Sequence, residues 1–209
     1  MKKLIILIVI SATCAGSLSA QDKKPTQWEL DNFMTFNWQI ATPISTDHLK
    51  KTSLAGGNFE YRRFLKSNMS VGIGFSWNSF KQYIAPKIYE KPDGSQQLYT
   101  DFIHYVYTLP IYLNAHYYFA GGEKIKPYAG IGLGAQFSSQ EAYYNIFVTE
   151  EDNWGFVARP EAGLLYKLSN YLGLHANVGF NYATNKNESF KIESLKHVYY
   201  NIGIYWNSY

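Results

Sequence analysis

Apolar residues alternate with small or neutral polar residues along most of the chain. Beyond the first 20 or so residues, this two-residue period recurs in about eight segments of about ten residues, and the 3.6-residue period of an amphipathic helix is almost absent. In one segment, for example, Val71, Ile73, Phe75 and Trp77 share one parity. Ten residues is also the length of a tilted strand that crosses a membrane. The pattern therefore predicts an all-β protein with eight strands.

The opposite parity separates a membrane barrel from a soluble sheet protein, whose second face would be rich in Lys and Glu. Here that parity carries small or neutral polar residues, such as Gly72, Gly74, Ser76 and Asn78 in the same segment. An apolar exterior and a polar interior suit a closed barrel in lipid, because every backbone group must then be hydrogen-bonded within the sheet. We therefore expect an eight-stranded antiparallel up-and-down transmembrane β-barrel. A soluble periplasmic ligand-binding barrel is the alternative.

The connections between the segments alternate in length. Short ones lie near residues 66–68, 120–124 and 169–170, and longer ones cover roughly 42–52, 81–101, 138–153 and 183–195. This alternation is typical of outer-membrane barrels, which have short periplasmic turns and longer extracellular loops. Pro110 and Pro160 fall inside expected strands, where each removes a hydrogen-bond donor, so we expect a bulge or local disruption at both.

The N-terminus has the features of a secretory signal. Lys2 and Lys3 precede the apolar run 4–10 and a stretch of small residues that ends at Ala20. We expect a signal peptide at 1–20, Sec-type export and a mature barrel domain at 21–209, with cleavage after Ser19 as the alternative. The single cysteine, Cys14, lies inside this leader, so the mature chain would have no disulfide; acylation of Cys14 stays open as an alternative.

Composition adds two exclusions. Aromatic residues make up 18% of the 209 residues and charged residues 17%, which excludes a disordered chain. Without Lys2 and Lys3, 17 basic residues face 16 acidic ones, so there is no electrostatic argument for nucleic-acid binding.

We expect a monomer of one domain, surrounded by outer-membrane lipid and lipopolysaccharide. The aromatic residues expected to face this lipid are Phe36, Trp38, Phe75, Trp77, Tyr117, Phe119, Phe137, Phe180 and Trp206.

Charged residues on the inward parity are the first candidate site. They lie on the second and sixth segments, which are opposite each other in a ring of eight, and they are Glu60, Arg62, Arg159, Glu161 and Lys167. An eight-stranded barrel is narrow enough for side chains to fill. We expect a salt-bridge network that plugs the lumen, because unpaired buried charges are costly. A small gated pore is the alternative.

An acidic and aromatic segment in the third long connection is the second candidate site. Its residues are Glu141, Tyr143, Tyr144, Phe147, Glu150, Glu151, Asp152 and Trp154. Such a segment could bind a cationic peptide, a sugar or a partner protein at the cell surface. The alternative is a solvated loop whose aromatic residues belong to the membrane girdle.

Catalytic and metal-binding signatures are absent from the sequence. His116 and His175 share the inward parity, but the histidines show no spacing typical of a zinc site, so we expect neither metal nor cofactor. We find no Gly-x-Ser-x-Gly motif and no Ser, His and acid cluster within the strands. The sequence therefore favours a structural or interaction protein over the remaining alternative, a lipid A-modifying hydrolase or acyltransferase.

Three stretches carry a family resemblance: Leu109–Leu113 leading to Tyr117–Phe119, then Lys126–Gly134, and the final segment Tyr199–Tyr209. With them, the chain resembles the small outer-membrane β-barrel proteins of Bacteroidetes, similar in plan to the transmembrane domain of outer-membrane protein A and to PorT-like barrels. The resemblance implies a fold and a location in the Gram-negative cell envelope. It also implies that the barrel-insertion machinery reads the C-terminal segment, where Gly203, Trp206 and Tyr209 match the family pattern.

Overall fold

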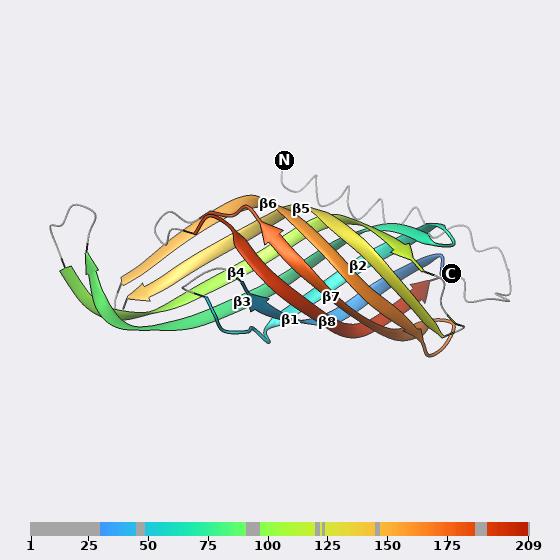
Figure 1. Ribbon diagram of the computed structural model, residues 1–209, viewed down its shortest axis with the longest axis horizontal. Helices are drawn as coiled ribbons and strands as arrows, with labels where there is room; N and C mark the ends of the chain where they lie inside the picture. The colour runs from blue at the N-terminus through green and yellow to red at the C-terminus, as the bar shows by residue number, and fades with distance from the viewer. Residues whose placement is uncertain are drawn as a thin grey trace, which may run out of the picture.

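Eight antiparallel strands form one closed barrel in the computed structural model, which describes residues 30–44, 49–90, 97–119, 122, 124–144, 147–186 and 192–208. Each strand pairs with its neighbours in the sequence, and the last pairs with the first (Figure 1). The all-β prediction and the number of strands are thus confirmed. The strands are β1 (Asn32–Pro43), β2 (Gly56–Lys66), β3 (Met69–Glu90), β4 (Gln97–Tyr118), β5 (Ile125–Tyr144), β6 (Phe147–Lys167), β7 (Leu172–Ala183) and β8 (Leu195–Ser208).

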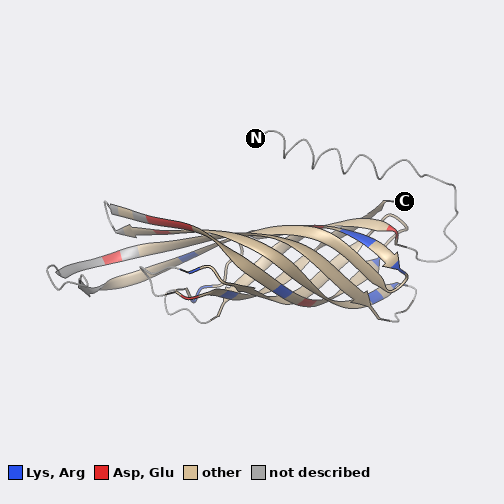
Figure 2. Ribbon diagram, turned by 90° about the horizontal axis from the view of Figure 1, so that it is seen from above, with Lys and Arg blue, Asp and Glu red and all other residues tan. Residues whose placement is uncertain are grey.

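Burial alternates along each strand because successive side chains point to opposite faces of a sheet. The outer surface is apolar: Trp38 and Trp77 are each 51% exposed and Leu113 is 69% exposed. All nine aromatic residues expected to face lipid point outward, although Phe137 and Phe180 are partly covered. Figure 2 shows that most charged positions on the ribbon lie toward the ends of the barrel. Among the described residues, no helix is long and apolar enough to span a membrane.

The two prolines interrupt pairing on one side only. Pro110 pairs with Gln136 of β5, while the β3–β4 ladder skips two pairs between Phe75 and Asn78 without a change of register. Pro160 behaves likewise: its pairing with β5 is intact, and the β6–β7 ladder skips two pairs. The expected local disruption is therefore present at both prolines. The register shifts lie elsewhere, at 64–66 in β2 and 84–87 in β3.

The barrel has a short wall and a tall wall. The connections at 66–69, 118–125 and 167–172 are at the same end as the start of β1 and the end of β8, which is the periplasmic end in barrels of this kind. At the other end, β3 to β6 continue beyond the first residue of β2 and the last residue of β7 (Figure 1). We call this continuation the projecting sheet; it comprises residues 79–90, 97–107, 138–144 and 147–156.

The projecting sheet corrects one expectation. The connections at 81–101 and 138–153 were expected as loops, but most of their residues belong to paired strands. The charged residues of these segments favoured loops in the sequence. However, charged side chains only keep a strand out of lipid; they do not prevent two strands from pairing in water. The two lateral edges of the sheet carry Pro86 on β3 and three consecutive acidic residues, 150–152, on β6. Proline and charge at an exposed edge both discourage pairing with another chain.

The lumen is filled along its length. One apolar cluster of Leu30, Phe33, Leu165 and neighbouring aromatic residues lies at the periplasmic end. A second cluster, which includes Leu49, Phe80, Val106 and Leu195, lies at the extracellular end. Polar and charged side chains occupy the layer between them. The expected signal peptide, its expected cleavage site and Cys14 lie outside the described residues.

Candidate functional site

Arg62 lies at the centre of the polar layer. The alternation of β2 turns Glu60 and Arg62 inward, and the alternation of β6 turns Glu161 toward them from the opposite wall. Nη2 of Arg62 lies 2.6 Å from Oε2 of Glu60 and 2.9 Å from Oε1 of Glu161. One guanidinium therefore bridges two buried carboxylates and neutralises part of their charge.

Hydroxyl and amide groups satisfy the remaining lone pairs of both carboxylates. Tyr112 donates to Oε1 of Glu60 at 2.9 Å, and Tyr199 donates to Oε2 of Glu161 at 3.0 Å. Further donors are Asn114 for Glu60 and Asn177 for Glu161, at 3.2 and 3.1 Å. Buried ion pairs are tolerated when additional hydrogen bonds of this kind complete the geometry. Both carboxylates of the cluster therefore find their hydrogen-bond donors within the chain.

Arg159 is held by a hydroxyl group and aromatic rings, in contrast to Arg62, which contacts two carboxylates. Its Nη1 donates to Oγ of Ser76 at 2.6 Å, and its guanidinium carbon lies 4.2 Å from the ring centroid of Tyr199 and 4.7 Å from that of Tyr112. Aromatic faces stabilise a cation through their quadrupole. With Arg159, the polar layer contains two arginines and two glutamates. Lys167 lies apart, half-buried near the periplasmic end of β6, and forms no ion pair with the described residues.

Inward glycines make room for inward tyrosines. The Tyr112 ring lies against Gly74 on β3 and Gly132 on β5, and a Cβ atom at either position would be 2.7 Å from ring atoms. Gly179 lies against Tyr199 in the same way, and Gly173 against Tyr205. A glycine on the neighbouring strand thus lets each ring lie across the lumen. This explains why the inward parity is rich in both residue types.

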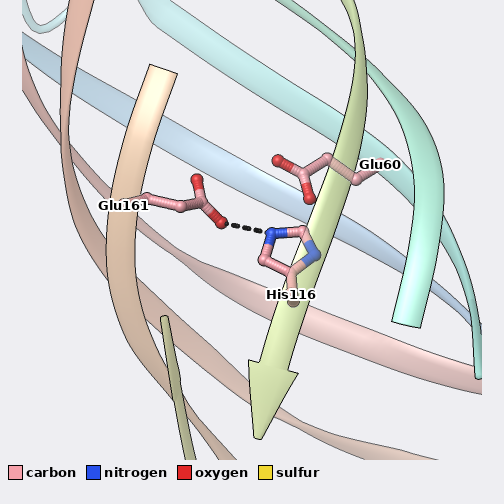
Figure 3. Close-up of side chains that lie close together, drawn as sticks. All are labelled: Glu60, His116 and Glu161. Atoms are coloured by element: carbon pink, nitrogen blue, oxygen red, sulfur yellow. Dashed lines mark hydrogen bonds and ion pairs between the residues drawn. The ribbon is translucent and has the colours of Figure 1, made fainter. Parts of the chain in front are cut away.

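Glu60, His116 and Glu161 are the one group of described residues with the donor set of a metal site (Figure 3). One ligand atom from each lies within 4.8 Å of the others. Two carboxylates and an imidazole suit a divalent cation. However, both carboxylates already bind Arg62, which supplies the positive charge at this point. His175 does not share a site with His116, because it hydrogen-bonds to Asn37 and Tyr128, each at 2.7 Å.

The second candidate site is spread over both faces of the projecting sheet. Glu141, Tyr143, Glu150 and Asp152 follow the outward parity, whereas Glu151 pairs in register with the inward Gln140. Trp154 also points outward, but its ring packs on Phe137 at a centroid distance of 5.4 Å, within the aromatic belt. The side chains of Tyr144 and Phe147 lie outside the described part of the structure.

The apolar clusters at the two ends of the lumen were missed by sequence reasoning. Phe33, Val106, Val157 and Leu165 each have the inward parity of their strand and are fully buried. Extending that parity to the strand ends would have identified them. Instead, apolar residues were assigned to lipid and polar residues to the lumen, and this rule holds only for the middle layer.

A closed antiparallel barrel with an apolar exterior and an ion-paired lumen defines a transmembrane β-barrel of the outer membrane. The chain belongs to the family described as the outer membrane protein beta-barrel domain, whose model matches residues 5–206. This confirms the expected outer-membrane location.

Solved structures share the fold. Neisserial surface protein A (NspA) is 15% identical, with 85% of this chain and 97% of that chain covered and a TM-score of 0.56. The attachment invasion locus protein Ail of Yersinia pestis, solved with the heparin analogue sucrose octasulfate, is 16% identical, with 86% and 99% covered and a TM-score of 0.51. No curated protein matches the chain.

Proposed function

We propose that this protein is a non-conducting outer-membrane anchor that presents the projecting sheet to other molecules at the cell surface. The observation that carries this proposal is the contrast between a filled lumen and a sheet that extends on one side beyond the barrel. On this reading, residues 1–20 are removed during Sec-type export, and residues 21–209 insert as a monomer. The family affinity within Bacteroidetes, PorT-like included, stays a prediction.

The filled lumen argues against the small gated pore. A conduit would require displacement of the ion-paired layer and of both apolar clusters. Within that layer, the Arg62 guanidinium is held by two carboxylates. A conduit would also leave buried charges without partners, which is costly.

The same layer argues against a lipid A-modifying enzyme. His116 and His175 hydrogen-bond to Glu161, Tyr128 and Asn37, and a serine nucleophile is not among these partners. A hydroxyl nucleophile would need such a base within hydrogen-bond reach.

The proposal also fixes the expected surroundings. Outer-membrane lipid and lipopolysaccharide surround the apolar wall, and the insertion machinery reads β8 at the C-terminus. A surface protein or glycan contacts the projecting sheet. The sulfated sugar bound in the Ail structure belongs to that protein, and the charged outward side chains described on this sheet are mostly acidic instead.

Site-specific photo-crosslinking on intact cells tests the proposal. A photoreactive phenylalanine analogue replaces Val148, which is 54% exposed on the projecting sheet, or Ile202, which is 60% exposed on the apolar wall of β8. We expect macromolecular adducts from position 148 and lipid adducts alone from position 202. Lipid adducts alone from both positions, or single-channel conductance of the purified protein, would overturn the proposal.

A further inference from the structure

The outer face of the projecting sheet carries aligned rows of tyrosines and carboxylates. In register, Lys81 of β3 lies beside Tyr105 of β4, Tyr105 beside Glu141 of β5, and Glu141 beside Glu150 of β6. The flanking rows place Ser139 between Tyr107 and Asp152 on one side, and Ile103 between Tyr83 and Tyr143 on the other. We call this surface the tyrosine–carboxylate face.

Tyr105, Tyr107 and Tyr143 form a continuous platform. Tyr105 stacks on Tyr107 with parallel rings, 6.2 Å between centroids and 4° between planes, and it meets the edge of Tyr143 at 5.6 Å. Tyr83, Tyr107 and Tyr143 are 55%, 40% and 39% exposed. Neighbouring contacts fix the rings, so a ligand would lose little side-chain entropy by binding them.

The platform already holds one ammonium group. Nζ of Lys81 lies 5.2 Å from the ring centroid of Tyr105, which is the geometry of a cation–π contact. Lys81 is also the one basic residue among the described outward side chains of the projecting sheet. Tyr107 and Tyr143 offer the same kind of ring to a cation from outside the molecule.

Carboxylates surround the platform and give it a negative charge. Glu141, Glu150 and Asp152 outnumber Lys81, and Asp101 adds a fourth carboxylate beside Tyr83. Tyr143 donates a hydrogen bond to Oε2 of Glu141 at 2.7 Å, and this bond raises the pKa of the Tyr143 phenol. Glu150 and Asp152 are exposed. Negative charge at these positions is therefore available to a partner.

Charge and polarity exclude three other occupants of the face. Hydrocarbon does not fit, because charged side chains in lipid are costly. Lipopolysaccharide phosphates and sulfated sugars carry the same sign as the carboxylates. A second copy of this chain that docks through this same face would bring the same negative charge, and like charges in an interface are repulsive.

We propose that the tyrosine–carboxylate face binds a lysine- or arginine-bearing segment of another protein. A basic side chain that stacks on Tyr143 would lie beside Glu141. Further basic side chains of the same segment would pair with Glu150 and Asp152 on β6, which is one strand from Tyr143 and two strand spacings, about 10 Å, from Tyr107. This inference rests on the proposed surface-contact function and names the partner chemistry.

Binding of defined peptides to the full mature protein tests this inference. The protein is placed in phospholipid nanodiscs free of lipopolysaccharide, and fluorescence anisotropy follows a labelled 12-residue peptide of alternating Arg and Gly. We expect saturable binding that weakens with salt, and no binding of the matched Glu–Gly peptide. The triple variant Glu141→Gln, Glu150→Gln, Asp152→Asn should lose roughly tenfold or more in affinity. Tyr107→Ala should lose severalfold and keep most of the salt dependence.

The matched control is Glu193→Gln, which removes an exposed carboxylate outside the projecting sheet. It should leave binding unchanged, and heat-dependent gel mobility would establish that each variant is folded. If the triple variant does not fold, the single variant Glu150→Gln provides the comparison. Equal affinity of variant and wild type, or binding of sucrose octasulfate in place of the basic peptide, would overturn the inference. If adducts still form at position 148 on cells, the surface-contact function stands and only the partner chemistry is wrong.

Discussion

The lumen and the tyrosine–carboxylate face use the same residue types for opposite purposes. In the lumen, Glu60 and Glu161 have Arg62 and several hydroxyl and amide donors as partners, and the whole cluster is buried. On the outer face, Glu150 and Asp152 are exposed and the excess charge is negative. Residue composition therefore does not distinguish a structural network from a binding surface. The distinction lies in whether the charges are already satisfied within the chain.

Removing the central cation of the lumen should have the largest effect. Arg62→Met leaves two buried carboxylates without their guanidinium, and the free energy of unfolding should fall by about 3–5 kcal/mol. Urea unfolding in detergent micelles measures the loss. Zn²⁺ should restore part of it, because Glu60, His116 and Glu161 then form an available donor set.

A further variant separates charge imbalance from loss of packing. The triple variant Arg62→Met, Glu60→Gln, Glu161→Gln removes all three charges and should recover much of the stability lost by Arg62→Met alone. An Arg62→Met protein as stable as wild type would show that the network does not hold the barrel closed.

Disruption of the contact between Gly179 and Tyr199 should have the next largest effect on the free energy of unfolding. A methyl group at position 179 overlaps the Tyr199 ring, which donates to Glu161, so Gly179→Ala should cost about 1–3 kcal/mol. Gly122→Ala is the matched control, because a Cβ there meets no atom within 4 Å. Equal stability of the two variants in thermal unfolding would contradict the packing described for the lumen.

Planar-bilayer recording separates a plug from a gate. Glu161→Ala removes one member of the network but leaves the apolar clusters in place at both ends of the lumen. We expect no rise in single-channel conductance. Discrete openings in this variant, absent from wild type, would instead indicate that the charged layer alone gates a conduit.

Neutralising the carboxylates of the tyrosine–carboxylate face should have the smallest effect on stability. Glu141→Gln, Glu150→Gln and Asp152→Asn together should change the free energy of unfolding by about 0.5 kcal/mol or less, because exposed charges contribute little to stability. Urea unfolding under the conditions used for Arg62→Met gives a direct comparison. A loss of several kcal/mol would assign these carboxylates a structural role.

Parity explains how much of the molecule was predictable from sequence. Two-residue alternation predicted eight strands, the lipid-facing wall and the inward direction of Glu60, Arg62, Arg159 and Glu161. It could not show that Arg159 lies against tyrosine rings rather than carboxylates, because partners across a lumen depend on strand stagger and side-chain length. Nor did it predict the projecting sheet. Strands in water tolerate charge, so a rise in charge marks the membrane boundary rather than the end of a strand.

The tall wall formed by β3 to β6 also fixes the direction of approach. The outer face of this wall continues the lipid-facing surface of the barrel, so it is turned sideways, along the plane of the membrane, rather than upward. A partner would therefore lie beside the barrel. For a neighbour anchored in the same membrane, the encounter becomes a two-dimensional search, in which lateral crowding and rotation of the barrel govern how often the two surfaces meet.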